Sequence, residues 1–114
     1  TTGIRAAPYM ASYSASKAAL THFTACAAME GGPANVRVNA IVPGQVMTAA
    51  TEDWASKAPE TAAKTASAIP MLRGGQPEEL AEAIVFLLSD AASYITGVAL
   101  PVDGGKAAQL YLPS

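Results

Sequence analysis

Small and apolar residues dominate the segment from Tyr9 to Glu30. Within it Leu20, Phe23 and Ala27 recur at the three-to-four-residue spacing of one helical face. Gly31-Gly32-Pro33 follows and is typical of a helix end. The pattern therefore predicts a first helix over residues 9–30.

A later helix has a clear start. Proline suits the first helical position, so Pro77 marks it, and Glu78 and Glu79 favour the positive end of the helix dipole. The pattern predicts a helix from Pro77 to about Ser89. Five of its apolar residues fall on one face, which we expect to cover a sheet: Leu80, Ala83, Ile84, Leu87 and Leu88.

Two segments have the composition of strands. Residues 35–42 are rich in β-branched residues and end at Pro43-Gly44, which is typical of a buried parallel strand. A second strand is predicted from Val98 to Val102, and its Pro101 is tolerable only at a sheet edge. The alternation of strands with helices predicts an α/β fold.

Residues 49–68 connect these elements. The stretch is polar and rich in alanine, and Pro59 interrupts it. We expect two short helices that are weakly attached to the body, because Trp54 is their only large apolar residue.

Composition narrows the classes of function. The chain of 114 residues carries a net charge of −2 and 14% charged residues, which gives no basic surface for nucleic acid. It contains no apolar run of the roughly 20 residues that a membrane span needs, so we expect a cytoplasmic protein. Cys26, the single cysteine, is expected to be a buried small apolar residue, and His22 a helix-surface or interface residue. We expect no metal site.

The candidate chemistry lies near the start of the first helix. Tyr13 and Lys17 are four residues apart, which on a helix places them on one face with about 5–6 Å between Cβ atoms. A tyrosine has an ordinary pKa of about 10, and a cation within about 4–6 Å favours its ionised form. The pair therefore suits a general acid and base. The spacing alone also fits a surface lysine beside a half-buried tyrosine.

The residues around this pair carry a resemblance. Tyr13-Ser14-Ala15-Ser16-Lys17-Ala18-Ala19-Leu20 closely resembles the active-site segment of the short-chain dehydrogenase/reductase family. The sequence from Arg73 to Gly105 is similar to the carboxyl-terminal third of the members of that family. This is clearest in Pro77-Glu78-Glu79-Leu80-Ala81 and in Val102-Asp103-Gly104-Gly105.

The resemblance implies a fold and an activity. Residues 1–114 would form the carboxyl-terminal part of one Rossmann-type oxidoreductase domain, a partial doubly wound parallel sheet with flanking helices. The implied reaction is hydride transfer between NAD or NADP and a small carbonyl or alcohol substrate. Tyr13 would be the general acid and base, tuned by Lys17. Both would also contact the cofactor, where Lys17 would hold the nicotinamide ribose.

The resemblance also implies contacts to the cofactor from the loop that follows the first strand. Pro43, Gly44, Val46 and Thr48 would lie beside the nicotinamide, with the Val46 backbone at the carboxamide. Thr48 equally suits the N-cap of a following helix, because Glu52 and Asp53 come soon after it. Residues 49–68 would be a substrate lid, and Trp54 would either anchor it or line the substrate pocket. The complete enzyme would be a homo-oligomer, a dimer or a tetramer, paired through the first helix.

Other parts of the family pattern are not found in these residues. The family's catalytic serine would fall just before Thr1, and Thr1 or Thr2 is a poor substitute in this register. No strand leads into a glycine-rich phosphate loop. Gly74-Gly75 precedes a helix but follows a loop, so we reject it as a phosphate site. Two alternatives therefore stay open: a non-catalytic module that associates through its first helix, and a related dehydratase or epimerase.

Overall fold

The computed structural model describes residues 9–110, so Thr1 and Thr2 lie outside the described residues. The described chain is α/β, as predicted. Its main elements are α1 (Ala11–Gly31), β1 (Ala40–Pro43), α2 (Ala49–Lys57), α3 (Pro59–Ser67), α4 (Pro77–Leu88) and β2 (Ala99–Val102). Two short 3-10 turns, η1 (Gly32–Ala34) and η2 (Asp90–Ala92), lie in the connections between them, and a third, η3 (Lys106–Ala108), follows β2.

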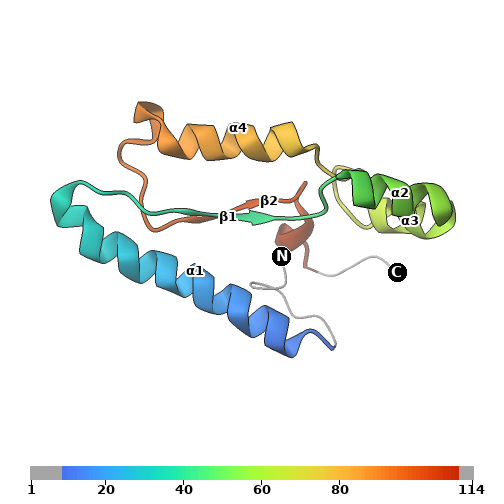
Figure 1. Ribbon diagram of the computed structural model, residues 1–114, viewed down its shortest axis with the longest axis horizontal. Coiled ribbons are helices and arrows are strands. Elements are labelled where there is room, and N and C mark those ends of the chain that lie inside the picture. Colours follow the sequence, from blue (N-terminus) through green and yellow to red (C-terminus); the bar gives the residue numbers. More distant parts are fainter. Residues whose placement is uncertain (1–8, 111–114) are drawn as a thin grey trace.

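The two strands form a parallel sheet in which Ala40 lies opposite Ala99 and Pro43 opposite Val102. Figure 1 shows α4 on one side of this sheet and α1 on the other, with α2 and α3 beyond the ends toward which the strands point. Pro101 lies on an edge strand of the described sheet, as expected, and it is exposed. The helices flank the sheet as in a doubly wound fold.

Both strands are shorter than predicted. The ladder begins only at Ala40, and residues 35–39 belong to the connection from α1. There the Val38 N–H donates to Thr96 Oγ1 at 3.1 Å, and the Val38 carbonyl accepts from the Gly97 N–H at 2.8 Å. Asn39 Nδ2 donates to the Ile95 carbonyl at 3.1 Å. These bonds to the turn before β2 replace the ladder, so the prediction of a strand over residues 35–42 was wrong at its start.

Arg37 closes the end of α4. Its Nη1 donates to the carbonyls of Leu87 at 2.6 Å and Ile95 at 3.2 Å, and its Nη2 donates to the Ser89 carbonyl at 3.2 Å. The last carbonyls of a helix lack partners within the helix and carry partial negative charge. One guanidinium thus ties the carboxyl end of α4 to the segment that leads into β1.

Helix α1 is long, as predicted, but begins at Ala11, because Tyr9 has a φ of 63°, which a right-handed helix cannot accommodate. Thr24 and Ala28 are its buried residues, whereas Leu20 and Phe23 are 57% and 67% exposed. The prediction that Cys26 is buried was wrong: Cys26 is exposed. At 100° per residue it lies about half a turn around the helix from Ala28, and so faces away from the sheet.

Helix α4 covers the sheet only in part. Leu87 is buried and Leu80 and Ala83 are half-buried, but Ile84 and Leu88 are 43% and 77% exposed. The expectation that all five apolar residues of this face cover a sheet was therefore wrong, because two strands are narrower than the helix face. Among residues 9–110 the buried side chains are Thr24, Ala28, Ile69, Leu87, Ala92 and Ala107.

Within the described residues, no helix has both the length and the apolar character that crossing a membrane requires.

Candidate active site

Helix α1 brings the predicted pair together. Lys17 Nζ lies 5.3 Å from the centre of the Tyr13 ring, within the range in which a cation is attracted to an aromatic face. Tyr13 is 51% exposed and Lys17 is exposed, so the phenol and the ammonium are both accessible to a ligand. The Ser16 hydroxyl donates to the Tyr13 carbonyl at 2.9 Å within the first turns of the helix.

Tyr13 and Lys17 also lie on the face of α1 that is turned toward the rest of the chain. Tyr13, Lys17, Thr24 and Ala28 are separated by four, seven and four residues, so they share one face of α1. Thr24 and Ala28 are buried on that face, which is therefore the face turned toward the rest of the chain. In Figure 1 the amino-terminal end of α1 is the end that lies nearer to the carboxyl ends of β1 and β2. Ligands of open α/β sheets bind at that end of the strands.

The loop after β1 is fixed at its start by Gly44. The Gly44 N–H donates to the Val102 carbonyl at 3.1 Å. A Cβ at position 44 would lie only 2.7 Å from Asp103 Cβ and 2.8 Å from Asp103 Cα. Only glycine allows this close approach of the two chains, so the identity of Gly44 has a packing cause. Pro43 ends β1 and is exposed.

The middle of the loop pairs with a distant segment. The Gly75 N–H donates to the Gln45 carbonyl at 2.8 Å, and the Met47 N–H donates to the Gly75 carbonyl at 2.8 Å. These bonds form an isolated parallel bridge between Val46 and Gly75. The Gly75 N–H and carbonyl are thus both used to hold the loop.

Thr48 is the N-cap of α2, which confirms one of its two predicted roles. Its Oγ1 lies 2.8 Å from Thr51 Oγ1 and accepts from the Thr51 N–H at 3.4 Å. Thr51, which sequence reasoning did not single out, also donates to the Val46 carbonyl at 2.7 Å. Thr48 itself is exposed. Its contact with a cofactor stays a prediction.

Residues 49–68 form two helices with a break before Pro59, as predicted. Neither α2 nor α3 has a buried residue. Trp54 is 36% exposed, so it anchors this pair of helices only weakly.

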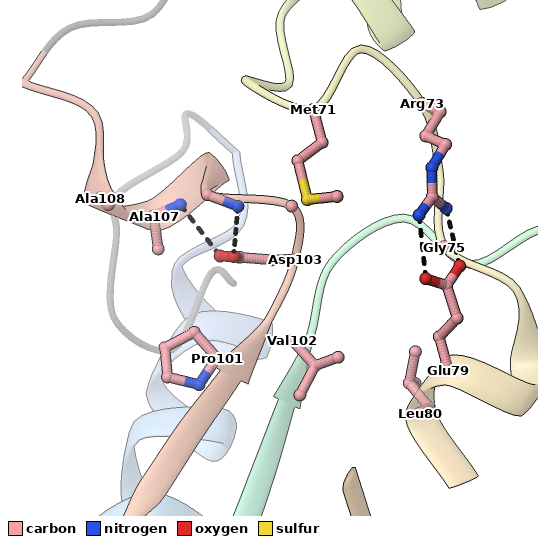
Figure 2. Close-up of a pocket in the computed structure, with 12 residues that line it drawn as sticks. Met71, Arg73, Gly75, Glu79, Leu80, Pro101, Val102, Asp103, Ala107 and Ala108 are labelled. Atoms are coloured by element: carbon pink, nitrogen blue, oxygen red, sulfur yellow. Dashed lines mark hydrogen bonds and ion pairs between the residues drawn. The ribbon is translucent and has the colours of Figure 1, made fainter. Parts of the chain in front are cut away.

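An ion pair at the start of α4 was not predicted. Arg73 Nη1 and Nη2 lie 2.6 and 2.9 Å from Glu79 Oε1 and Oε2, a bidentate contact that Figure 2 shows. Glu79 Oε1 also accepts from the Gln76 N–H at 3.0 Å. The hydrogen bond from Arg73, with that from Gln76, lowers the pKa of Glu79 to about 2. A glutamate in the first turn after a proline is a recognisable capping signal, but nothing local names Arg73 as its partner.

A cavity of about 610 Å³ lies beside this ion pair (Figure 2). Leu80, Val102 and Met71 are among its apolar lining residues, and no residue of the 43–48 loop lines it. Asp103, also in the lining, accepts from the Gly105 and Ala107 N–H groups at 3.0 and 2.9 Å. The polar groups of Asp103, Arg73 and Glu79 at this cavity are thus engaged within the chain.

Lowering the pH is expected to remove the contribution of the ionised Glu79 carboxylate to the stability of the folded chain. Its pKa is about 2 in the folded chain, below the ordinary value of 4.5, so its contribution is present above pH 4.5 and is lost as the pH falls toward 2. Because the pair is exposed, Glu79→Gln should lower the melting temperature only slightly at pH 7, and not measurably near pH 2. Melting curves of the two proteins across this range test it, and a difference that does not change with pH would contradict it.

Comparison with known proteins shows the family to which the chain belongs. Residues 1–107 match the family described as enoyl-(acyl carrier protein) reductase. The 3-oxoacyl-[acyl-carrier-protein] reductase FabG of Thermotoga maritima is 46% identical over 103 residues, which are 90% of this chain and 41% of the relative. The chain belongs to the short-chain dehydrogenase/reductase family, as the resemblance indicated.

Solved structures agree with this class. The structure of 4-hydroxyisoleucine dehydrogenase complexed with NADH matches with a TM-score of 0.84 and 38% identity, over 95% of this chain and 44% of that one. ElxO with NADP bound matches with a TM-score of 0.87 and 30% identity, over 95% and 44%. These proteins have the Rossmann fold, and the chain spans less than half the length of each.

Proposed function

We propose that this chain supplies the catalytic part of an NAD(P)-dependent oxidoreductase. Residues 1–114 would be the carboxyl-terminal portion of a Rossmann-type domain acting on a carbonyl or alcohol carbon of a small molecule. The observation that carries the proposal is the placement of Tyr13 and Lys17 side by side on the sheet-facing side of α1. The relatives support it, since one is named as a 3-oxoacyl reductase and the solved structures hold NADP or NADH.

Tyr13 and Lys17 have different roles in the proposed reaction. In reduction the Tyr13 hydroxyl donates a proton to the substrate oxygen, and in oxidation it takes that proton back. The Lys17 ammonium, 5.3 Å from the centre of the Tyr13 ring, would place a positive charge beside the phenol and has N–H donors for the ribose hydroxyls. The nicotinamide, when bound, supplies or accepts the hydride.

The 43–48 loop would hold the nicotinamide side of the cofactor. Gly44 fixes its start against Asp103, and the bonds of Gly75 to Gln45 and Met47 fix the backbone on either side of Val46. A rigid backbone presents its amide groups without an ordering cost. In this proposal Pro43, Gly44 and Val46 lie beside the nicotinamide, and the exposed Thr48 hydroxyl reaches the cofactor while it caps α2.

Two neighbouring surfaces complete the proposal. Helices α2 and α3, which lack buried residues, would close over the substrate as a lid and exclude water. The exposed Phe23 of α1, which lies off the face shared by Tyr13 and Lys17, would pair with a second copy of the chain and make the enzyme a homo-oligomer.

The test uses a chimera in which residues 1–114 follow the amino-terminal part of the Thermotoga maritima reductase. Oxidation of NADPH and NADH is followed at 340 nm with 3-oxoacyl thioesters and cyclic ketones as substrates. Ketone-dependent oxidation of either cofactor supports the proposal. A folded chimera that binds the cofactor and reduces no ketone contradicts it.

In the same chimera Lys17→Ala is expected to weaken cofactor binding and to move the activity optimum to higher pH, because the site loses the positive charge beside the Tyr13 ring. Glu82→Ala, at an exposed charged residue of α4 outside the proposed site, is the control and should leave both quantities unchanged. KM for NADPH and the pH profile are measured for each. An unaltered pH profile in a folded Lys17→Ala protein would contradict the tuning role.

A further inference from the structure

One carboxylate holds the whole turn between Arg73 and Gln76. Glu79 receives two bonds from the Arg73 guanidinium, at 2.6 and 2.9 Å, and one from the Gln76 N–H at 3.0 Å. Arg73 Nη1 also donates to the Gly74 carbonyl at 3.1 Å. Glu79, in the first helical turn of α4, therefore holds both ends of the turn that precedes it. Figure 2 shows its contact with Arg73.

The middle of this turn holds the 43–48 loop. Gly75 exchanges backbone bonds with Gln45 and Met47, both at 2.8 Å. Gly74 is buried, and a Cβ there would lie 2.9 Å from Met47 Sδ, so the Met47 side chain occupies the space that a side chain at position 74 would need. The position of the loop on either side of Val46 thus depends on the conformation of residues 73–76.

From this geometry we infer that Arg73 and Glu79 are positioning residues for the cofactor loop. The ion pair sets the 73–76 turn, the turn sets Gly75, and Gly75 sets the backbone at Val46. Neither side chain needs to touch the cofactor. The inference rests on the proposed function in one respect, that the 43–48 loop contacts the nicotinamide.

The Arg73–Glu79 pair is exposed, so we expect its effect to be confined to the neighbouring loop. The Arg73 and Glu79 side chains are 49% and 45% exposed, and exposed ion pairs contribute little to the stability of a whole domain. A bidentate arginine–carboxylate contact nevertheless fixes orientation well, because two parallel bonds define a plane. We therefore expect its loss to loosen one loop rather than to unfold the chain.

Amide hydrogen exchange of the chimera, resolved to single residues, tests the inference directly. Glu79→Gln and Arg73→Gln should each make the Met47 and Gly75 amides exchange about two- to fivefold faster, the effect that an exposed pair can supply. Amides of β1 and β2 should keep their rates. Arg73→Gln separates the pair from the capping bond, since Glu79 can still accept from Gln76 in that variant.

The matched control is Asp53→Asn, which breaks the exposed Lys57–Asp53 pair of 3.0 Å in α2 and should leave Met47 and Gly75 unchanged. Unchanged exchange at Met47 and Gly75 in both test variants would overturn the inference. Equal acceleration in β1, β2 and the loop would also overturn it, because the pair would then act on global stability.

The chimera supplies a second readout. Glu79→Gln should raise KM for NADPH about two- to fivefold with little change in kcat, the fold-change expected from the same exposed pair. A fall in kcat with unchanged KM would argue against a positioning role. The exchange measurement needs no cofactor, so a positive exchange result with a wild-type chimera that ignores NADPH would contradict the proposed function and support the positioning of the loop.

Discussion

Replacement of Tyr13 by phenylalanine is expected to lower the turnover of the chimera by at least about 10²–10⁴-fold, the usual contribution of general acid–base catalysis. Phenylalanine keeps the ring over which Lys17 lies and removes only the transferable proton. Cofactor binding should therefore change little. Steady-state kinetics give the loss of kcat, and fluorescence titration with NADPH gives the affinity.

Tyr94→Phe is the control for this substitution. Tyr94 is fully exposed in the turn before β2, so loss of its hydroxyl should leave kcat unchanged. Nearly full activity of a Tyr13→Phe chimera would remove Tyr13 from the mechanism, and with it the observation that carries the proposed function.

Residues 1–114 expressed alone are expected to show no measurable dehydrogenase activity, while the chimera is active. The chain spans 41% of the relative's length, and its sequence contains no strand that opens into a glycine-rich phosphate loop. Without that loop the pyrophosphate of a dinucleotide loses its backbone donors. NADPH oxidation by equal concentrations of the two proteins measures the difference.

The same protein should associate or be marginally stable. Its described sheet has only two parallel strands, so α1 and α4 pack on it only in part and leave apolar side chains exposed. Its radius of gyration, 15.8 Å, exceeds the value of about 13 Å expected for a compact domain of this length. Light scattering after size exclusion and thermal unfolding test this. A stable monomer that binds NADPH tightly and reduces a ketone would refute both expectations.

Some contacts of the candidate site join residues that are close in the sequence, and others join distant segments. Only the first kind was predictable. Tyr13 and Lys17 were predictable because helical geometry alone places residues four apart side by side. The cap at Thr48 was predictable for the same reason, since its partner Thr51 is three residues away. The anchors of the 43–48 loop were not, because Gly75 and Asp103 are distant in the sequence and nothing in the spacing of residues names them as partners.

The same distinction holds for the fold: features set by nearby residues were predicted, and features set by distant contacts were not. Pro77 with its two glutamates, the stop at Gly31, and the break at Pro59 are local signals, and each appears within a residue or two of its predicted place. The start of β1 was misjudged because Arg37 and Asn39 bond to residues near 87–95 instead of extending the strand. Cys26 was misplaced because α1 is so rich in small residues that its sequence does not define a buried face.

The sequence by itself therefore determined the helices, the turns that end them and the Tyr13–Lys17 pair, because these depend on residues within about one helical turn of each other. Only the tertiary structure decided which face of α1 is buried, where the β1–β2 ladder begins, and that Arg73 and Glu79 support the loop through Gly75. Those features depend on which distant segments meet in space. Charge, spacing and hydrophobic pattern constrain that choice but do not specify it.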